Sequence, residues 1–168
     1  MAKQPEILPV DKVLSQYSKA HQNPTNKALQ WLYVPLITFG LLGLIWAIPF
    51  PHLDFLGRYN GFVNWASFVI AFSIYYYYKL SPLLSYGMLL VVFAFSAGIV
   101  SLEKLHSNHG WPQLPQVCLI IFILGLFFQF IGYKAEGKIP SFRDNLAFLL
   151  TGPMWLIQQL LKKARLIR

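Results

Sequence analysis

Charged residues are scarce in this chain. They make up 12% of its 168 residues, and only 6 are acidic, against 14 Lys and Arg. Soluble domains carry about 25% charged residues, so the composition excludes an ordinary soluble domain. The chain has one cysteine, Cys118, which excludes an internal disulfide. Its length accommodates one domain, and we therefore expect a single membrane domain over residues 1–168.

The chain is rich in apolar residues. Hydrophobic residues form 56% of the chain, and they gather in four runs at about 29–50, 62–79, 83–102 and 117–133. A membrane-spanning helix needs about 20 mainly apolar residues to cross about 30 Å. Each connection between the runs contains Pro or Gly, which favour turns. The sequence therefore predicts an all-α fold, an integral membrane bundle of four transmembrane helices.

Two further segments flank these spans. Residues 146–161 are apolar but short, and Gly152 and Pro153 interrupt them. We expect an interfacial or re-entrant helix there rather than a fifth span. The residues before the first span predict an N-terminal amphipathic helix. The four tyrosines at 75–78, next to Lys79, are typical of an aromatic belt at the membrane interface.

Basic residues would lie almost entirely on one side of a four-span bundle. Of the 14 Lys and Arg residues, only Arg58 and Lys104 fall on the other side. Because basic loops remain in the cytoplasm, both termini are predicted to be cytoplasmic, in a bacterial inner membrane or the endoplasmic reticulum. Cations next to apolar runs favour anionic lipid headgroups over nucleic acid as partners. The basic side holds Lys3, Lys12, Lys19, Lys27, Lys79, Lys134, Lys138, Arg143, Lys162, Lys163, Arg165 and Arg168.

Two polar segments at span boundaries carry the candidate site residues. Residues 17–30 enter the first span, where Asn23-Pro24 predicts a turn and Asn26 a helix N-cap. Residues 128–140 leave the fourth span. With four spans, both segments emerge on the same side of the membrane. We therefore expect convergence of His21, Gln30, Gln129, Tyr133 and Glu136.

The order of these motifs resembles a known family. His21-x-x-Pro24-x-Asn26 runs into a span that contains Pro35, and Gln129-Phe-x-Gly132 is followed by Glu136 and then by Asp144-Asn145-Leu146. This arrangement, over nearly the whole chain, resembles the Mpo-type 2-hydroxy fatty acid dioxygenases, a family of small multi-span membrane proteins. The resemblance implies α-oxidation of fatty acids, because studied fungal members remove one carbon from 2-hydroxy fatty acids using iron(II) and oxygen.

The resemblance also implies roles for particular residues. His21 would be a ligand of iron(II), and Glu136 and Gln129 would be catalytic. Six residues would contact the long-chain acyl substrate: Asn26, Gln30, Tyr133 and, at its carboxylate, Lys27, Lys134 and Arg143. Gln30 and Tyr133 stand where the family has histidines. Since iron(II) in non-haem oxygenases is held by imidazole and carboxylate, we expect a divergent member that acts on or binds a long-chain lipid at the cytoplasmic membrane boundary.

Other functions remain open at this point. The chain could be a metal-free lipid-binding relative of the family. It could also be a structural subunit of a membrane complex or a homo-oligomer, with its basic faces in contact with partner chains. His106 and His109 have the spacing of a separate metal site on one helical turn. In a four-span bundle they would lie with His52 at the opposite side, about 30 Å from His21.

Overall fold

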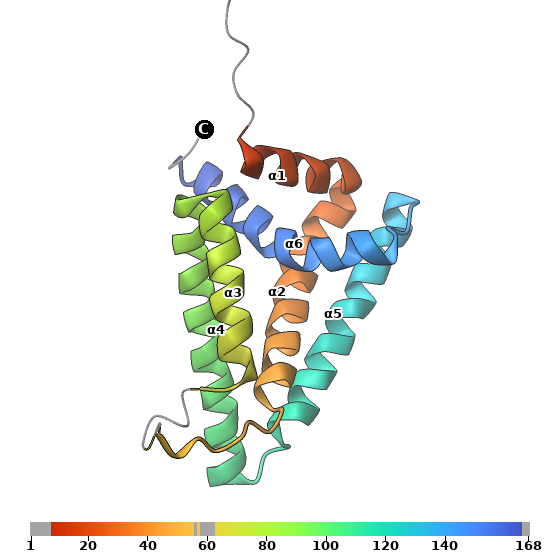
Figure 1. Ribbon diagram of the computed structural model, residues 1–168. Coiled ribbons are helices and arrows are strands. Elements are labelled where there is room, and N and C mark those ends of the chain that lie inside the picture. The colour runs from red at the N-terminus through yellow and green to blue at the C-terminus, as the bar shows by residue number, and fades with distance from the viewer. Residues whose placement is uncertain (1–7, 56, 58–62, 166–168) are drawn as a thin grey trace, which may run out of the picture.

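The computed structural model describes residues 8–55, 57 and 63–165. These residues form an all-helical fold in which six helices follow one another along the chain (Figure 1). The helices are α1 (Pro9–Ala20), α2 (Pro24–Trp46), α3 (Trp65–Leu80), α4 (Pro82–His109), α5 (Leu114–Glu136) and α6 (Phe142–Lys163).

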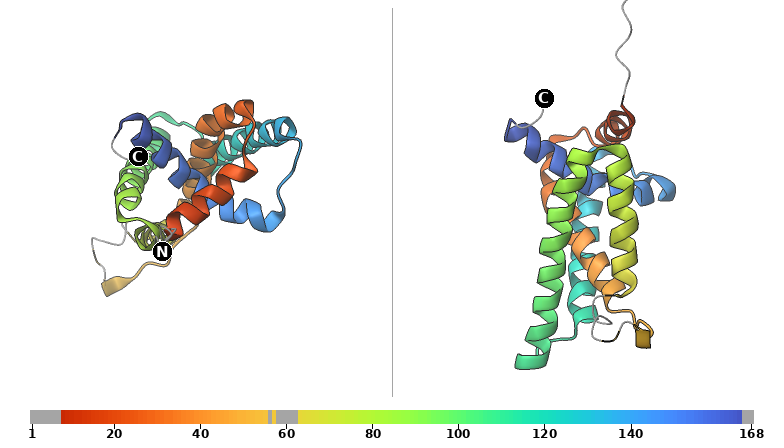
Figure 2. Two further views of the ribbon diagram at one scale, coloured as in Figure 1. Left: turned by 90° about the horizontal axis from the view of Figure 1, so that it is seen from above. Right: turned by 60° about the vertical axis from the view of Figure 1, so that its left-hand side comes forward.

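The helices form two groups that differ in direction. The helices α2, α3, α4 and α5 run roughly along one axis and make up the bundle, whereas α1 and α6 lie across one end of it (Figures 1 and 2). The α3–α4 turn and the α5–α6 connection are at that same end (Figure 1). We refer to it as the capped end.

Three helices of the bundle, α2, α4 and α5, are long and apolar enough to cross a membrane. They identify the chain as a membrane protein, as its composition indicates. The predicted span at 62–79 corresponds to α3, which has 16 residues. At 1.5 Å per residue, α3 covers about 24 Å of the roughly 30 Å hydrocarbon layer. A fourth span therefore stays a prediction.

The helix boundaries depart from the predicted spans. The first run was expected at about 29–50, but α2 begins at Pro24 and ends at Trp46. Pro24 is compatible with the first helical position because it lacks the N–H that would be unpaired there. The run at 83–102 extends as α4 to His109, where Gly110 adopts a left-handed conformation with φ 66° and ends the helix.

The helix α6 is continuous through Gly152 and Pro153, which were expected to interrupt it. Its buried segment comprises residues 151–157. The hydroxyl of Tyr77 in α3 donates a hydrogen bond of 2.9 Å to the Leu150 carbonyl of α6. Tyr77 is thus a buried support for α6 rather than part of an exposed aromatic belt, while Tyr75 and Tyr78 are exposed. Packing of α6 against α1, α2 and α4 offsets the loss of the hydrogen bond that Pro153 removes from the helix.

The helix α1 has one buried face. Pro9 occupies its first turn, and Val10, Leu14 and Tyr17 recur at the spacing that places side chains on one side of a helix. This face packs against α6, and the rest of α1 is largely exposed. The residues before the first span therefore form a helix with an apolar and a polar side.

The closest helix pair is α2 and α5. Gly40 and Gly43 of α2 face α5, and a Cβ atom built on Gly40 would lie only 2.8 Å from the Phe122 backbone nitrogen. Cys118, fully buried, fills the space beside Gly43. Small residues allow helix backbones to approach closely inside membranes. This tight pair is the frame on which the polar end of the protein is assembled.

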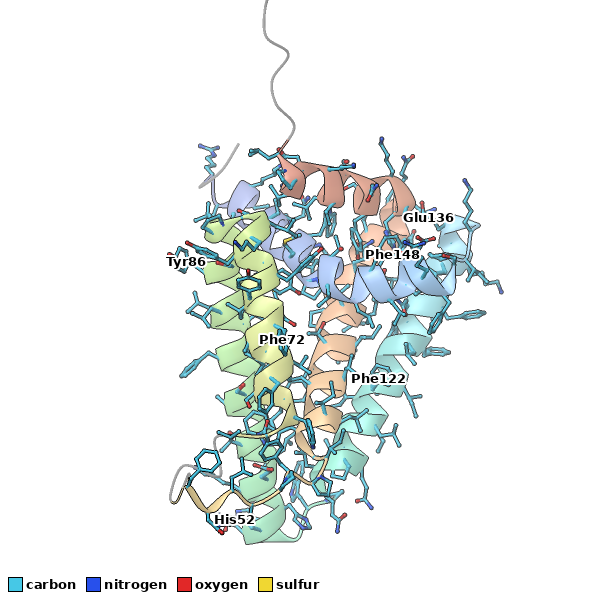
Figure 3. All side chains as sticks on the ribbon, in the orientation of Figure 1. His52, Phe72, Tyr86, Phe122, Glu136 and Phe148 are labelled. Carbon is cyan, nitrogen blue, oxygen red and sulfur yellow. The ribbon has the colours of Figure 1, made fainter. Side chains whose placement is uncertain are left out.

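The two ends of the bundle differ in charge. Glu136 lies at the capped end and His52 at the other (Figure 3). The basic residues of α1, of the first turn of α2 and of the second half of α6 belong to the capped end, and Lys104 and His109 near the end of α4 belong to the other. Lys3, Arg58 and Arg168 lie outside the described residues. The membrane orientation of the two ends stays a prediction.

Candidate functional site

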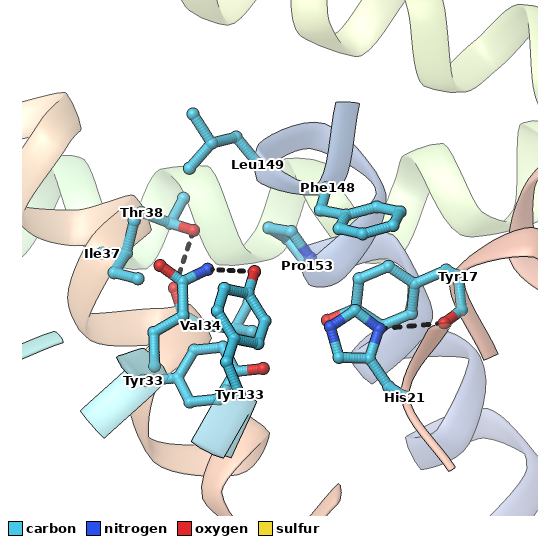
Figure 4. Close-up of a pocket in the computed structure, with 11 residues that line it drawn as sticks. Tyr17, His21, Tyr33, Val34, Ile37, Thr38, Tyr133, Phe148, Leu149 and Pro153 are labelled. Atoms are coloured by element: carbon cyan, nitrogen blue, oxygen red, sulfur yellow. Dashed lines mark hydrogen bonds between the residues drawn. The ribbon is translucent and has the colours of Figure 1, made fainter. Parts of the chain in front are cut away.

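A small polar cavity lies beneath α1 at the capped end of the bundle. Its volume is about 20 Å³, which accommodates about one water-sized group. Its polar lining consists of Tyr17, His21, Tyr33, Gln129 and Tyr133, together with Thr38 (Figure 4). We call this cavity the polar chamber. It brings together three of the five side chains that were expected to converge, His21, Gln129 and Tyr133.

His21 is buried at the end of α1 and stacks on Tyr17, with their ring centroids 4.3 Å apart. Its Nδ1 lies 2.9 Å from the Tyr17 carbonyl oxygen. Because a carbonyl only accepts, Nδ1 carries the proton and Nε2 keeps its lone pair. Burial lowers the pKa of His21, against the opposing effects of that hydrogen bond and of the Glu136 charge. His21 therefore enters the chamber as a neutral imidazole that can accept a hydrogen bond through Nε2.

Tyr133 joins α5 to α6 at the chamber wall. Its hydroxyl donates to the side-chain oxygen of Asn145 and accepts a 2.9 Å hydrogen bond from the Gln129 amide nitrogen. A histidine at this position would be shorter than tyrosine and could not bridge these two side chains in the same way. The side-chain oxygen of Gln129 keeps lone pairs that can accept a hydrogen bond.

Glu136 does not line the chamber but fastens the α1–α2 corner to the end of α5. Its carboxylate accepts hydrogen bonds from the backbone N–H of Gln22 at 2.7 Å, from that of Asn23 at 3.1 Å and from the Asn26 amide at 2.9 Å. The Asn23 amide donates in turn to the Ala135 carbonyl at 2.9 Å. Carboxylates are favourable beside the unpaired N–H groups at the start of a helix. Glu136 thus holds the position of the residues that build the chamber.

Asn26 was expected to cap α2, and that prediction is wrong. The cap is Asn23, whose side chain accepts from the N–H groups of Thr25 and Asn26, because Pro24 starts the helix three residues earlier. Asn26 is fully buried instead. It donates to Glu136 and accepts a 3.3 Å hydrogen bond from the Tyr33 hydroxyl. Gly132 makes room for it, since a Cβ there would lie 2.3 Å from the Asn26 side-chain oxygen.

Gln30 lies one helical turn beyond Asn26 and is also fully buried. Its nearest polar partner is the Tyr33 hydroxyl, whose proton is directed to Asn26, and among the described residues neither atom of the Gln30 amide makes a well-aligned hydrogen bond. An unpaired buried amide group costs about 1–3 kcal/mol. Gln30 is not part of the chamber lining, but it adds unmet hydrogen-bonding capacity to the same end of α2.

The three predicted carboxylate-binding cations lie outside the chamber. Lys27, Lys134 and Arg143 are exposed, and the chamber lining includes none of them. Lys27 lines a separate groove beside α1. The structure therefore does not bring these cations together with His21 and Gln129.

Two apolar grooves adjoin the polar chamber. The first, of about 210 Å³, lies along α6 and includes Trp31, Val34 and Pro153. The second, of about 100 Å³, faces α3 and α4 and includes Ile70 and Met88. We call them the α6 groove and the α3 groove. Thr38 lines both grooves and the chamber as well, so a polar end and apolar surfaces meet at one residue.

The donor groups at this end do not fit an iron(II) site. Iron(II) in such oxygenases is held by several imidazole and carboxylate ligands. Within residues 8–55, 57 and 63–165, the structure contains no group of three or more His, Cys, Asp and Glu side chains placed to hold a metal. His21 is the one imidazole in the chamber lining, and the oxygens of Glu136 are occupied by three donors. Burial raises the pKa of Tyr17 well above its usual value, which keeps this phenol neutral and a poor ligand.

Several residues of the site escaped prediction from the sequence. Tyr17 lies four residues before His21, a spacing that places both on one face of a helix, and this signal could have identified it. Asn145 belongs to the Asp-Asn-Leu motif quoted above. Phe148, whose ring packs edge-on against His21 at 5.1 Å, is one apolar residue in an apolar run. Nothing in the local sequence distinguishes it.

The comparisons with known proteins give one match. The family model described as 2-hydroxy-palmitic acid dioxygenase Mpo1-like matches residues 7–164. No curated protein and no solved structure matches the chain.

Proposed function

Since this chain belongs to the Mpo1-like family of 2-hydroxy-palmitic acid dioxygenases, we propose that it is a divergent member that binds a long-chain 2-hydroxy fatty acid without an iron(II) centre. The 2-hydroxyl group of the lipid, which is the size of one water molecule, enters the polar chamber, and the tail lies in the adjoining apolar grooves. The observation that carries this proposal is the position of Thr38, where chamber and grooves share a wall. Binding sites commonly combine an apolar lining with a few oriented polar groups.

The chamber offers matching groups for a hydroxylated head. The Nε2 atom of neutral His21 and the side-chain oxygen of Gln129 can each accept a hydrogen bond. A 2-hydroxy group supplies a donor that a plain fatty acid lacks at that carbon. A buried polar group left unpaired costs about 1–3 kcal/mol. The 2-hydroxyl is therefore expected to favour binding.

The grooves supply the surface for the tail. The walls of both grooves are mainly apolar, since most lining residues are aliphatic or aromatic, such as Leu42, Val91 and Phe95. Burying apolar surface contributes about 25 cal/mol per Å². Membrane lipid can enter from the side, because Leu160 and Trp31 of the α6 groove are themselves partly exposed. This route keeps the tail in an apolar environment throughout.

The family's chemistry oxidises its lipid with iron(II), and the donor set of this chain does not support that step. Gln30 and Tyr133 occupy the histidine positions of the family motifs. Tyr133 is engaged with Gln129 and Asn145, and Gln30 offers a neutral amide. Of these two positions, Tyr133 therefore serves in the wall of the proposed lipid site.

A titration of detergent-purified protein with 2-hydroxypalmitic acid in the presence of a metal chelator tests this proposal. The Thr38→Phe variant fills the point where the chamber meets both grooves. The phenylalanine ring and the bound lipid would compete for the same space, and overpacking of this kind costs about 1–3 kcal/mol. The affinity for the lipid is therefore expected to fall by about 5- to 150-fold. The matched control is Ser101→Phe, an exposed α4 hydroxyl that also bonds the carbonyl four residues earlier.

We expect saturable binding by the wild type, weaker binding of palmitic acid, and wild-type affinity in Ser101→Phe. Thermal unfolding of each variant establishes that it is folded. The proposal would be refuted by a wild type that binds neither acid saturably, or by a folded Thr38→Phe variant that binds as well as the control.

A further inference from the structure

The groove beside α1 that Lys27 lines is larger than the α3 and α6 grooves. It has a volume of about 580 Å³ and is separate from the polar chamber. Three helices contribute one lysine each to its lining, Lys19 from α1, Lys27 from α2 and Lys162 from α6. We call it the basic groove. One acidic side chain, Asp11, also lines it, which leaves the lining with an excess of positive charge.

The three lysines have no acidic partner among the described residues. Within residues 8–55, 57 and 63–165, no carboxylate lies within ion-pairing distance of any of them. All three are exposed. Cations that converge from separate helices repel one another, and an anion between them would relieve that repulsion. The groove is therefore suited to a compact, strongly charged anion.

A fixed hydroxyl adds a hydrogen-bond donor to this lining. The buried indole of Trp155 donates a 3.0 Å hydrogen bond to Ser18 Oγ, which holds this hydroxyl in the wall of the groove. Ser18 then has its own proton to donate, and it bonds no acceptor in the part of the chain that the structure describes. Lysine ammonium groups and hydroxyls are common ligands of phosphate.

The position of the groove indicates where the phosphate comes from. The groove lies beside the start of α2, one of the helices able to cross the membrane, and the ends of such helices reach the headgroup region. Trp31, one turn further along α2, carries the ammonium of Lys163 over its ring at 4.7 Å. Tryptophan is enriched at the level of the headgroups.

We propose that the basic groove binds the phosphate group of an anionic phospholipid. The lysines supply charge from three directions, and Ser18 supplies a directed donor. The headgroup would contact α1, α6 and the first turn of α2 at once. The bound lipid would therefore stabilise the packing of these three helices at the capped end. A zwitterionic phospholipid carries a compensating cation in its headgroup and would bind this groove more weakly.

Short-chain phospholipids test the proposal on the full-length, detergent-purified protein. Native mass spectrometry or calorimetry measures the binding of dihexanoyl phosphatidic acid, dihexanoyl phosphatidylcholine and inorganic phosphate. The groove variant combines Lys19→Gln, Lys27→Gln and Lys162→Gln. Its matched control combines Lys79→Gln, Lys134→Gln and Lys138→Gln, which removes the same charge at the same end of the bundle but outside the groove.

We expect one saturable site for phosphatidic acid in the wild type. Each lysine near an anionic lipid strengthens binding roughly fivefold, so the groove variant is expected to lose at least about 30-fold in affinity, and the control less than about threefold. Ser18→Ala, which changes no charge, is expected to weaken binding as well. An equal loss in both triple variants, or equal binding of phosphatidylcholine, would overturn the proposal. Inorganic phosphate that binds as tightly as phosphatidic acid would overturn the assignment to a lipid.

Discussion

The Glu136→Ala variant is expected to lose about 3–4 kcal/mol of unfolding free energy, because three N–H donors lose a charged acceptor. Those donors are the backbone N–H groups of Gln22 and Asn23 and the fully buried amide of Asn26. Water can replace the carboxylate as the hydrogen-bond acceptor for the N–H of Gln22, which is exposed. Water cannot reach the buried amide of Asn26, which is left without an acceptor. The midpoint of thermal unfolding in detergent is expected to fall by about 6–16 °C.

The control for this prediction is Glu103→Ala, which removes a carboxylate on α4 near the other end of the bundle that interacts with one side-chain donor, Trp46, in place of three donors. It is expected to change the midpoint by less than about 2 °C, as most exposed substitutions do. The unfolding midpoint of Glu136→Gln is expected to lie between those of the two alanine variants, since the glutamine side chain keeps one accepting oxygen. A Glu136→Ala variant as stable as Glu103→Ala would show that the α1–α2 corner is not held by this carboxylate.

The Gly40→Ala variant is expected to separate α2 from α5 at a cost of about 3 kcal/mol. A Cβ atom at this position would lie 2.8 Å from the Phe122 nitrogen and 2.9 Å from the Cys118 carbonyl oxygen. Both are backbone atoms, so no side-chain rotation can relieve the clash. The expected result is a clear fall in the unfolding midpoint and faster labelling of the buried Cys118 thiol by a maleimide.

Gly98→Ala is the matched control for this substitution. Its Cβ would meet only the edge of the Phe39 ring, at 3.1 Å, and a ring can shift by a few tenths of an ångström. Because glycine weakens a helix interior, Gly98→Ala is expected to be neutral or slightly stabilising. Equal stability and equal Cys118 labelling in the two variants would contradict the close α2–α5 contact.

The presence of the helices could be predicted because each depends on the length of an apolar run. The residues at which the helices end could not be predicted in this way. The order of the helices follows from the order of the apolar runs. Four runs separate the segment at 17–30 from the segment at 128–140, and an even number of crossings returns the chain to the same end of the bundle. This predicts that His21 lies near Gln129 and Tyr133. The end of α2 at Trp46 and the continuation of α6 through Pro153 depend on tertiary packing. The sequence around Pro153 predicted an interruption of the helix, because it does not show that this part of α6 is buried against other helices.

The role of Glu136 illustrates a different limit. Its place in a motif indicated chemistry, and the sequence carries no sign that its partners would be N–H groups more than a hundred residues away. Tyr77 is a similar case, because one member of a tyrosine run is buried under α6 while its neighbours are exposed. Long-range hydrogen bonds of this kind depend on the assembled bundle and are not encoded in local spacing.

We propose that this chain keeps the site of its family as a lipid-binding site without an iron(II) centre. The most direct test is the iron content of detergent-purified protein after anaerobic loading with iron(II), measured beside the His21→Ala variant. We predict background iron in both proteins, since one neutral imidazole and an occupied carboxylate cannot retain the ion. Near-stoichiometric iron in the wild type that is lost in His21→Ala would refute a metal-free site and favour the dioxygenase chemistry of the family for this chain.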